Sequence, residues 1–497
     1  MQDINLQLPH ILDQIIASLP FLKAELALAV AFLGSIVATL FLDKHWKYCS
    51  FVVTVLGIVV SFLCVTSQYE QSQQGIFGML TVDNFSVFAR GIQLVALLFS
   101  VVFVQQHFQH KKLDKKLGDA YSILLTAGLG LNILTMTTNW LMAFIAIETV
   151  SISSYVLVGF FSESKKQSEA AMKYVLFGSV SAAVMLYGLS LLYGFTGNLD
   201  FTAFEHIQGL IEAPKILLTV ALLFMFAGIG FKLSFVPFHV WSPDVYEGAP
   251  TPITAFLSTV PKVGVLVLLA RLFEEWTSSS FYFSELVLIL ISVAAIVTML
   301  AGNLIALRQT NIKRMMAYSS IGHTGFLLMA IVGNLASEPQ VLLYYIAVYT
   351  LMNLGVFGFI DVLERRIGSV QLEDYKGLGK NYPLLFSAFT VLGISLVGLP
   401  PTAGFVGKLF VFTSIFDLFQ FNNNPYYLIL LITGALTSVI SLFYYFKIPL
   451  FAFLRKGEEK ETSSVADTKV VYVLSIILGI AILMLGIFPS ILLSLFK

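Results

Sequence analysis

The stretch GFKLSFVPFHVW, from Gly230 to Trp241, conflicts with its surroundings in two ways. It ends an apolar run, yet Lys232 lies in that run and Pro237 follows five residues later. An ammonium group inside a membrane-spanning segment costs roughly 2.5–3.5 kcal/mol or more, and proline removes a backbone donor and breaks a helix. Non-helical backbone at membrane depth is tolerated where it is buried in protein or lines a water-filled cavity. The stretch therefore predicts a polar site inside a membrane protein.

Composition places the whole chain in the membrane. Of its 497 residues, 57% are apolar and 12% are charged, against about 25% charged in soluble domains. The net charge is zero, so the charge balance does not suggest a nucleic-acid partner. The start, MQDINLQLPH, lacks a basic cluster and does not resemble a cleaved signal peptide. Cys49 and Cys64 lack metal or redox spacing and are interpreted as packing residues.

Apolar runs of roughly twenty residues, the length of a membrane-spanning helix, recur along the chain and predict fourteen spans. They are too long for strands and do not alternate. The predicted fold is an all-α polytopic membrane protein with a single domain over residues 1–497. The predicted spans are 20–42, 49–67, 84–107, 119–138, 140–161, 171–195, 215–237, 251–272, 283–306, 315–334, 340–363, 383–420 (interrupted by GLPPTAG), 425–453 and 470–495.

The charges of the connecting loops predict an orientation. Loops 1, 3, 5, 9, 11 and 13 are rich in lysine and arginine, whereas most even loops have few. By the positive-inside rule the odd loops are cytoplasmic, so both termini lie on the outer side. The seventh loop, HVWSPDVYEGAPTP, has neither lysine nor arginine and does not contribute to the assignment. The lysine- and arginine-rich loops are DKHWKY, HKKLDKKLGD, SESKK, RQTNIKR, ERRIGSVQLEDYKGLGK and LRKGEEK.

A few ionisable residues lie inside the predicted spans. Four unpaired charges facing lipid would together cost on the order of 10 kcal/mol, so these residues are expected to face protein or water. A purely structural set of ion pairs is disfavoured, because three lysines and one glutamate do not pair off. The central residues are Glu148, Lys232, Lys262, His323 and Lys408; Lys173 and Glu25 lie nearer span ends.

Buried lysines can carry protons. Burial and like-charged neighbours lower the pKa of a lysine side chain, whereas a nearby carboxylate favours its charged form. The four residues Glu148, Lys232, Lys262 and Lys408 are therefore predicted to form a proton path. For Lys173 and Glu25, pairing or snorkelling is an equal alternative. For His323, a hydrogen-bonded packing role is an equal alternative to a proton relay.

The positions of these residues suggest an internal repeat. Lys232 and Lys408 are 176 residues apart, and each ends a Gly-x-x-x-Lys in an interrupted span. Glu148 and His323 are 175 residues apart. This predicts two five-helix units, 119–272 and 283–453. Five is an odd number, so the units would have opposite topology, as in many transporters.

Cofactor motifs are missing from the sequence. GLGLN and GIGFK lack the third glycine of a dinucleotide fingerprint, and GFVGKL lacks the first glycine and the Ser/Thr of a P-loop. There is no cysteine cluster for iron–sulfur ligation. No nucleotide or redox cofactor is expected on this chain, so energy would come from a partner or from another ion's gradient.

Several long motifs resemble a known family. They are GFKLSFVPFHVWSPDVYEGAPTPITAFLSTVPKVG, NIKRMMAYSSIGHTGFLLMA and GLPPTAGFVGKLFVF. The chain resembles the antiporter-like membrane subunits of respiratory complex I over essentially its whole length. Within that family, PDVYEGAP is most similar to the subunit N (subunit 2) group of bacterial NADH–quinone oxidoreductase. The resemblance also implies fourteen helices and an inverted five-helix repeat.

The resemblance implies roles for particular residues. It places the family's glutamate of helix 5 at Glu148 and its lysines of helices 6, 7, 8 and 12 at Lys173, Lys232, Lys262 and Lys408. A lysine in helix 12 favours subunit N over subunit M, and no long lateral helix follows the last span, which argues against subunit L. The resemblance does not assign a role to His323.

The expected function is proton translocation in the membrane arm of complex I, in the bacterial inner (cytoplasmic) membrane. NADH, FMN, iron–sulfur clusters and quinone would be bound by partner subunits. The alternatives are a subunit of a multi-subunit sodium/proton antiporter or of a membrane-bound hydrogenase, and a scaffold that does not pump. A sodium site needs several oxygen ligands, and no aspartate lies at the middle of a predicted span.

Overall fold

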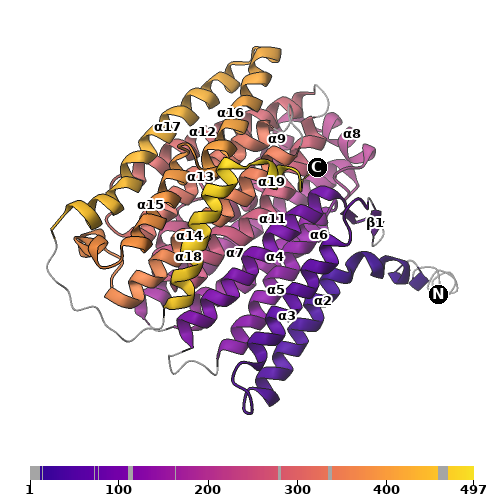
Figure 1. Cartoon of the computed structure of the whole chain (residues 1–497). Coiled ribbons are helices and arrows are strands. Elements are labelled where there is room, and N and C mark those ends of the chain that lie inside the picture. Colours follow the sequence, from indigo (N-terminus) through magenta and orange to yellow (C-terminus); the bar gives the residue numbers. More distant parts are fainter. Residues whose placement is uncertain are drawn as a thin grey trace.

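The structure, a computed structural model, describes residues 12–13, 15–71, 73–75, 78–109, 116–162, 164–277, 281–333, 339–456 and 468–496. Most of the predicted basic loop HKKLDKKLGD and part of LRKGEEK lie outside these residues. Within them, the chain forms a bundle of long helices that run side by side (Figure 1).

The described part of the chain has fourteen helices long and apolar enough to cross a membrane, as predicted. The long helices are α2 (Lys23–Val37), α3 (Cys49–Thr66), α4 (Asn84–Phe108), α5 (Leu117–Met136), α6 (Trp140–Phe160), α7 (Lys165–Thr196), α9 (Lys215–Leu233), α11 (Thr251–Thr277), α12 (Tyr282–Ala306), α13 (Ile312–Gly333), α14 (Gln340–Ile367), α16 (Ala403–Asn422), α17 (Pro425–Pro449) and α18 (Lys469–Ile487).

Shorter elements join or extend these helices. They are η1 (Leu19–Leu22), η2 (Ala38–Leu42), β1 (Gln73–Gly75), β2 (Leu80–Val82), α8 (Phe204–Glu212), α10 (Trp241–Gly248), η4 (Leu372–Tyr375), η5 (Leu378–Lys380), α15 (Pro383–Val397), η6 (Leu450–Leu454) and α19 (Ser490–Leu493). The two strands pair antiparallel. Neither the hairpin nor α8 was expected from the sequence, because both are too short to give a hydropathy signal.

The helix bounds differ from the predicted spans where local capping decides them. The sixth span begins at Lys165 rather than residue 171, because the Ser164 side chain accepts a hydrogen bond from the backbone N–H of Gln167 and caps α7. The last span ends at Ile487, shortly before Pro489. Hydropathy detects the apolar part of a helix, and it does not detect a polar first turn such as KKQSEA.

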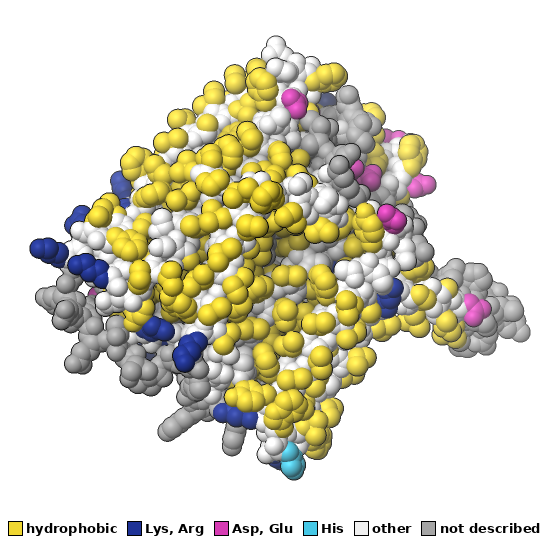
Figure 2. Space-filling view, in the orientation of Figure 1, with side chains coloured by type: hydrophobic (Ala, Val, Ile, Leu, Met, Phe, Trp, Pro, Cys, Tyr) yellow, Lys and Arg dark blue, Asp and Glu magenta, His cyan; other side chains and the backbone are white. Residues whose placement is uncertain are grey.

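Charge is distributed unevenly along the bundle. Figure 2 shows most of the visible Lys and Arg side chains at one end, and most of the visible Asp and Glu toward the other. The last short helix, α19, lies toward the acidic end (Figure 1). Hydrophobic side chains cover the surface between, as expected for a surface in contact with lipid.

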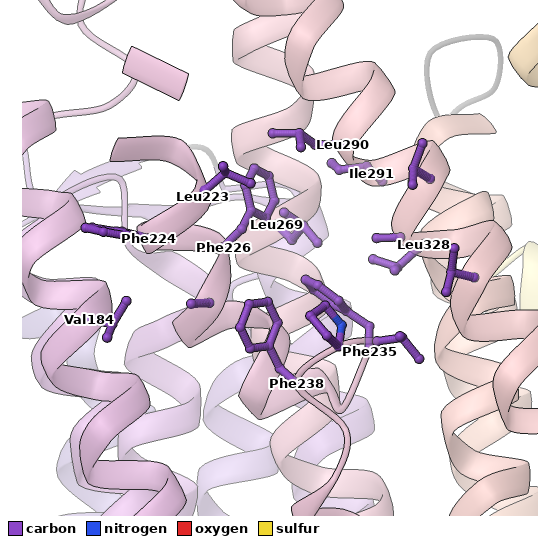
Figure 3. Close-up of a pocket in the computed structure, with 16 residues that line it drawn as sticks. Val184, Leu223, Phe224, Phe226, Phe235, Phe238, Leu269, Leu290, Ile291 and Leu328 are labelled. Atoms are coloured by element: carbon purple, nitrogen blue, oxygen red, sulfur yellow. The ribbon is translucent and has the colours of Figure 1, made fainter. Parts of the chain in front are cut away.

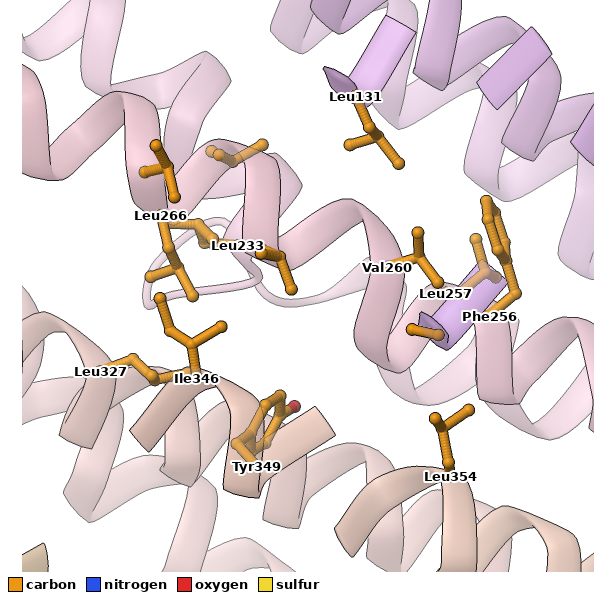
Figure 4. Close-up of a cluster of buried hydrophobic side chains, with 14 of the residues drawn as sticks. Leu131, Leu233, Phe256, Leu257, Val260, Leu266, Leu327, Ile346, Tyr349 and Leu354 are labelled. Atoms are coloured by element: carbon orange, nitrogen blue, oxygen red, sulfur yellow. The ribbon is translucent and has the colours of Figure 1, made fainter. Parts of the chain in front are cut away.

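Three helices form the centre of the bundle. The apolar windows of α11, α13 and α14 are each 94% buried, whereas those of α3 and α18 are 28% buried. Figure 4 shows apolar side chains of these central helices, among them Val260, Leu266, Leu327 and Ile346, packed together. They surround the segment that carries Lys262 with an apolar environment, in which charges interact strongly and unpaired polar groups are costly.

Close packing of α12 against α13 depends on a glycine. A Cβ at Gly302 would lie 2.4 Å from the backbone nitrogen of Gly322 and 2.8 Å from the carbonyl oxygen of Tyr318. Backbone atoms of a helix cannot move aside without shifting the helix. Small residues that allow backbones to approach closely are typical of helix interfaces in membranes.

The variant Gly302→Leu is therefore expected to separate α12 from α13 and to destabilise the protein by about 1–3 kcal/mol or more. The measurement is the thermal unfolding midpoint of the detergent-solubilised protein. Gly194→Leu is the matched control, because no atom lies within 4 Å of a Cβ at Gly194. Equal midpoints for the two variants would contradict this account of the interface.

Candidate functional site

The first interruption lies where the sequence predicts it. Helix α9 ends at Leu233, Ser234 adopts a left-handed conformation with φ 60°, and the Val236–Pro237 peptide bond is cis. The short helix α10 then starts at Trp241. Lys232 lies in the last turn of α9, just before the break.

Side chains satisfy the backbone groups that this break frees. The Trp241 indole N–H donates to the Phe231 carbonyl (2.9 Å), and the Val236 N–H donates to Thr298 Oγ1 (3.0 Å). The Leu233 carbonyl accepts from Thr324 Oγ1 at 3.0 Å. Helices α12 and α13 thereby hold the break in place, as buried non-helical backbone in a membrane requires.

The second interruption separates α15 from α16. Helix α15 ends at Val397, Gly398 has φ 89°, the Pro400–Pro401 bond is cis, and α16 starts at Ala403. The conformation at Gly398 favours glycine. A Cβ there would also lie 2.7 Å from Cδ of Lys408, so the lysine packs directly against the break.

The Lys408 side chain donates hydrogen bonds to the carbonyl groups that the second break frees. Its Nζ donates to the carbonyl oxygens of Leu396 (3.0 Å) and Val397 (2.8 Å) and to Ser438 Oγ (3.3 Å). The ammonium also lies 4.3 Å from the ring centroid of Phe326, an electrostatically favourable position. The side chain is 4% exposed. Lys408 is therefore a buried amine whose hydrogen bonds to the carbonyls of Leu396 and Val397 and to the Ser438 hydroxyl are all made to neutral groups.

Lys262 is held in the same way in the middle of α11. Its Nζ donates to Ser320 Oγ (2.8 Å), to the Ser320 carbonyl (3.2 Å) and to Thr324 Oγ1 (2.9 Å). Tyr349 extends this group, because its hydroxyl lies 2.8 Å from Ser320 Oγ and donates to the Ser258 carbonyl (3.1 Å). Lys262 is 2% exposed. No carboxylate lies within ion-pair distance of Lys262 in the described chain.

His323 lies between the two buried lysines. Its ring nitrogens are hydrogen-bonded to the hydroxyls of Tyr345 (3.0 Å) and Tyr445 (3.2 Å). Its ring centroid lies 5.5 Å from that of Tyr349 and 6.2 Å from that of Phe326, and these two rings lie beside Lys262 and Lys408 respectively. The structure thus brings these three sequence-predicted residues into one buried group on α11, α13 and α16.

Lys232 and Glu148 lie near each other without forming an ion pair. The Lys232 ammonium donates to the hydroxyl of Tyr155 at 3.1 Å, and Glu148 accepts a long hydrogen bond from Ser151 (3.4 Å). Glu148 acts electrostatically on both Lys232 and Tyr155. Because Ser151 and Tyr155 stand on α6 one turn apart, hydroxyl groups fill the interval between the carboxylate and the amine.

Lys173 occupies a different environment from the other lysines. It forms ion pairs with Glu169 (2.7 Å) and Asp244 (2.8 Å). Asp244 in turn pairs with Arg314 at 2.6 Å, which ties α10 to α7 and α13. The structure therefore places Lys173 in an ion-pair network rather than in the group of neutral-partnered lysines.

This network lowers the pKa of the Asp244 carboxyl. Burial raises the pKa of the Asp244 carboxyl, but hydrogen bonds from Lys173 and Arg314 outweigh burial and hold that pKa below its usual range. A carboxyl whose pKa is lowered on folding adds stability above its unfolded pKa, and this stability is lost as the pH falls through the folded pKa. The attachment of α10 is therefore present at neutral pH and weakens only in acid.

Glu25 forms an ion pair in the first helices of the chain. It accepts from Arg90 (3.2 Å) and from the side chain of Asn132 (3.1 Å). The structure thus shows Glu25 in an ion pair, which is one of the alternatives that the sequence left open for this residue. Arg90 was missed in the sequence, although it is a charge inside the third predicted span and the search that found Glu25 could have found it.

Sequence reasoning also missed the hydroxyl groups around the lysines. Tyr155, Ser320, Thr324, Tyr349 and Tyr445 lie on apolar helices, where tyrosine, serine and threonine are common and give no distinct signal. Their role depends on which helix faces pack around Lys232, Lys262 and His323, and the sequence of a single helix does not show this.

An apolar cavity of about 530 Å³ lies beside the first break. Figure 3 shows the rings of Phe226, Phe235 and Phe238 pointing into it, with Leu269 and Ile291 from α11 and α12. The lining is almost wholly apolar. This side of the break therefore offers no place for an ion, and the polar groups gather on the side facing α6, α11 and α13.

Thr324 links the first break to Lys262, because its hydroxyl donates to the Leu233 carbonyl and accepts from the lysine. Thr324→Val is expected to lower stability by about 1–3 kcal/mol, since buried polar groups lose their partner. The measurement is the thermal unfolding midpoint in detergent. Thr413→Val is the control, because Thr413 is exposed and bonds only its own helix. A midpoint no lower than that of the control would show that this link is not structural.

This chain is similar to known proteins in both sequence and structure. Residues 137–441 match the family described as NADH:quinone oxidoreductase/Mrp antiporter, TM. A relative from Chloroherpeton thalassium, NADH-quinone oxidoreductase subunit N 2, is 40% identical over 413 residues, covering 82% of this chain and 80% of the relative.

Two solved structures have a similar fold. A chain of respiratory complex I from Thermus thermophilus with bound aureothin superposes with a TM-score of 0.78 at 28% identity, covering 95% of this chain and 98% of the other. A chain of the Mrp complex from Dietzia sp. superposes with a TM-score of 0.76 at 19% identity, covering 95% and 96%. The second likeness concerns the fold alone.

Proposed function

Since this chain belongs to the NADH:quinone oxidoreductase/Mrp antiporter family of membrane subunits, we propose that it is the N subunit of a NADH–quinone oxidoreductase (complex I). In this role it translocates protons in the membrane arm, driven by NADH oxidation and quinone reduction in sister subunits. The names of its relatives and the likeness to a complex I chain support the assignment.

One observation carries the proton-handling part of the proposal. Lys232, Lys262 and Lys408 have only hydroxyl and carbonyl hydrogen-bond partners among the described residues. A buried cation kept for stability is normally paired with a carboxylate. Hydroxyl groups can donate as well as accept, so these sites can hold an amine with or without its extra proton.

The residues are proposed to act in sequence. Glu148 biases the charge of Lys232 through the intervening hydroxyls, and Lys232 exchanges a proton with Lys262 by way of the hydroxyl groups of α13. His323 relays the proton from Lys262 toward Lys408, because its ring contacts those of Tyr349 and Phe326, which lie beside the two lysines. Lys408, at the second break, is the terminal site. Bound water would complete the path where no side chain bridges the residues.

Lys173 is proposed to act differently, as part of the network that positions α10. Its partners are carboxylates, so it lacks the neutral environment of the other lysines. A fixed α10 holds the break beside Lys232 in one conformation.

The two interruptions support a repeat of five-helix units over 119–272 and 283–453. Each break has a left-handed residue, Ser234 or Gly398, followed three residues later by a proline. The lysines lie on opposite sides of their breaks: Lys232 precedes the first and Lys408 follows the second. The two Gly-x-x-x-Lys motifs therefore lie in helices of similar composition. They do not occupy the same position relative to the break.

The chain is a multi-pass membrane protein, and we place it in the bacterial inner membrane with both termini on the outer side. The gathering of Lys and Arg at one end of the bundle supports this orientation. We expect NADH, FMN, iron–sulfur clusters and quinone on partner subunits. A sodium/proton antiporter remains the rival activity, but lysines occupy the breaks where a sodium ion would need oxygen ligands.

The proposal predicts that Lys232→Ala lowers the number of protons pumped per NADH in the purified complex reconstituted into liposomes. A positioned proton-transfer group contributes roughly 10²–10⁴-fold to its step, so coupled turnover should fall at least about tenfold. Lys215→Ala is the matched control, since Lys215 lies at the exposed end of the same helix. Pumping equal to wild type in the Lys232 variant would remove this role.

The same liposomes distinguish the rival activities. Proton uptake that proceeds at full rate without sodium ions is expected of the proposed function, whereas an absolute requirement for sodium would favour the antiporter. If Glu148→Gln and Lys408→Ala altered only the assembly of the complex and left pumping per NADH intact, the chain would be a scaffold.

A further inference from the structure

A second buried polar cluster lies outside the lysine path, on α2, α4 and α5. Arg90 is completely buried and donates to Glu25 Oε1 (3.2 Å), to Gln68 Oε1 (2.8 Å) and to the Ser86 carbonyl (3.3 Å). Asn132 donates to the same Oε1 of Glu25 at 3.1 Å. The Oε1 atom of Glu25 thus accepts two hydrogen bonds, while its Oε2 atom accepts none from the described residues.

Four buried polar atoms of Glu25, Asn132 and Gln93, the last of which lies one turn after Arg90 on α4, have no hydrogen-bond partner among the described residues. They are Glu25 Oε2, Asn132 Oδ1 and both polar atoms of the Gln93 amide. The three residues are at most 5% exposed. Buried polar atoms almost always have a partner, and buried water molecules usually satisfy those that the protein leaves free. Three of the four atoms are acceptors, and water can donate to each of them.

The cluster is connected to one end of the bundle by polar contacts. The hydroxyl of Thr135 donates to the Asn132 carbonyl (2.7 Å), and the Thr135 carbonyl accepts from Arg271 (3.2 Å). Arg271 pairs with Asp83 at 2.7 Å, and the Asp83 side chain is 28% exposed. This is the end where α4 begins and α5 ends, which is the outer side in the proposed orientation.

The cluster also reaches the helix that carries Lys262. A Cβ at Gly264 would lie 2.9 Å from Nε2 of Gln93. The amide of Gln93 is therefore seated against the backbone of α11, where only glycine leaves room for it. It makes no hydrogen bond within the described chain, so an apolar side chain of the same shape would serve packing better.

We propose that Glu25, Gln93 and Asn132 enclose bound water and form a proton site that connects the outer surface with α11 beside Lys262. Arg90 positions the Glu25 carboxylate and keeps one of its oxygens directed at the water. Glu25 is the group that accepts and releases the proton. This route is separate from the one through Lys408, and its transport role rests on the proposed function.

The test uses the whole complex with Glu25→Gln and, separately, Gln93→Met, which keeps the length of the side chain and leaves the Arg90–Glu25 pair intact. Protons pumped per NADH in liposomes are expected to fall in both variants. Glu274→Gln is the control, because it removes an exposed carboxylate at the same end of α11. An electron cryo-microscopy map of the wild-type complex, at a resolution that shows water, is expected to contain density beside Glu25 Oε2.

The outcomes separate this proposal from the proposed function. Absent water density, or pumping equal to wild type in both variants, would overturn it and leave a structural clamp between helices. If the Glu25→Gln variant does not assemble into the complex, the number of protons pumped per NADH by the Gln93→Met variant decides between the two interpretations. If Lys232→Ala leaves pumping unchanged, the proposed function fails, but the water density still confirms or overturns the hydrated site.

Discussion

The chain depends on one constraint: an ammonium group buried in hydrocarbon must find oxygen partners, and a broken helix supplies them. A helix that stops inside the membrane exposes carbonyl groups that water cannot reach, and each would cost free energy if left unpaired. Lys408 donates to the carbonyls of Leu396 and Val397, so the break and the lysine satisfy each other. The first break follows a related pattern, in which Thr324 takes the Leu233 carbonyl and also accepts from Lys262.

Helix α13 is the element that joins these sites. Its small polar residues, Ser320 and Thr324, face Lys262, and His323 faces the tyrosines of α14 and α17. The neighbouring helices α11 and α14 are 94% buried over their apolar windows and contribute the apolar side chains of the core. The surrounding low dielectric strengthens each electrostatic interaction among these polar groups, so the addition or loss of one proton is felt by the neighbouring groups.

The charged residues in the helices of this protein have two kinds of partner. The partly exposed Lys173 and the buried Arg90 are paired with carboxylates, and such pairs fix helices relative to each other at little net gain in stability. The lysines of the central path are surrounded by hydroxyls and carbonyls, which tolerate a change in charge. In the proposed function, the residues paired with carboxylates position helices and the lysines with neutral partners transfer protons; residue type alone would not have revealed this contrast.

Much of the fold could be read from the sequence. The fourteen spans follow from apolar length, because a helix in lipid must be apolar over the thickness of the membrane. Pro237 and the Pro400–Pro401 pair marked the two breaks, and the lysines were visible because charge is rare in such segments. Arg90 could have been found by the same reasoning, and the short elements α8 and α10 could not, because they carry no hydropathy signal.

The partners of each charge were decided only by the tertiary structure. Tyr155, Ser320 and Tyr445 look like ordinary residues of apolar helices, and their function depends on the helix face that packs beside them. The sequence could not tell that Lys173 also pairs with Asp244 while Lys262 bonds Ser320, since these partners lie 71 and 58 residues away along the chain. Hydropathy and charge are properties of single segments, whereas the protonation chemistry of a buried amine is a property of the contacts between them.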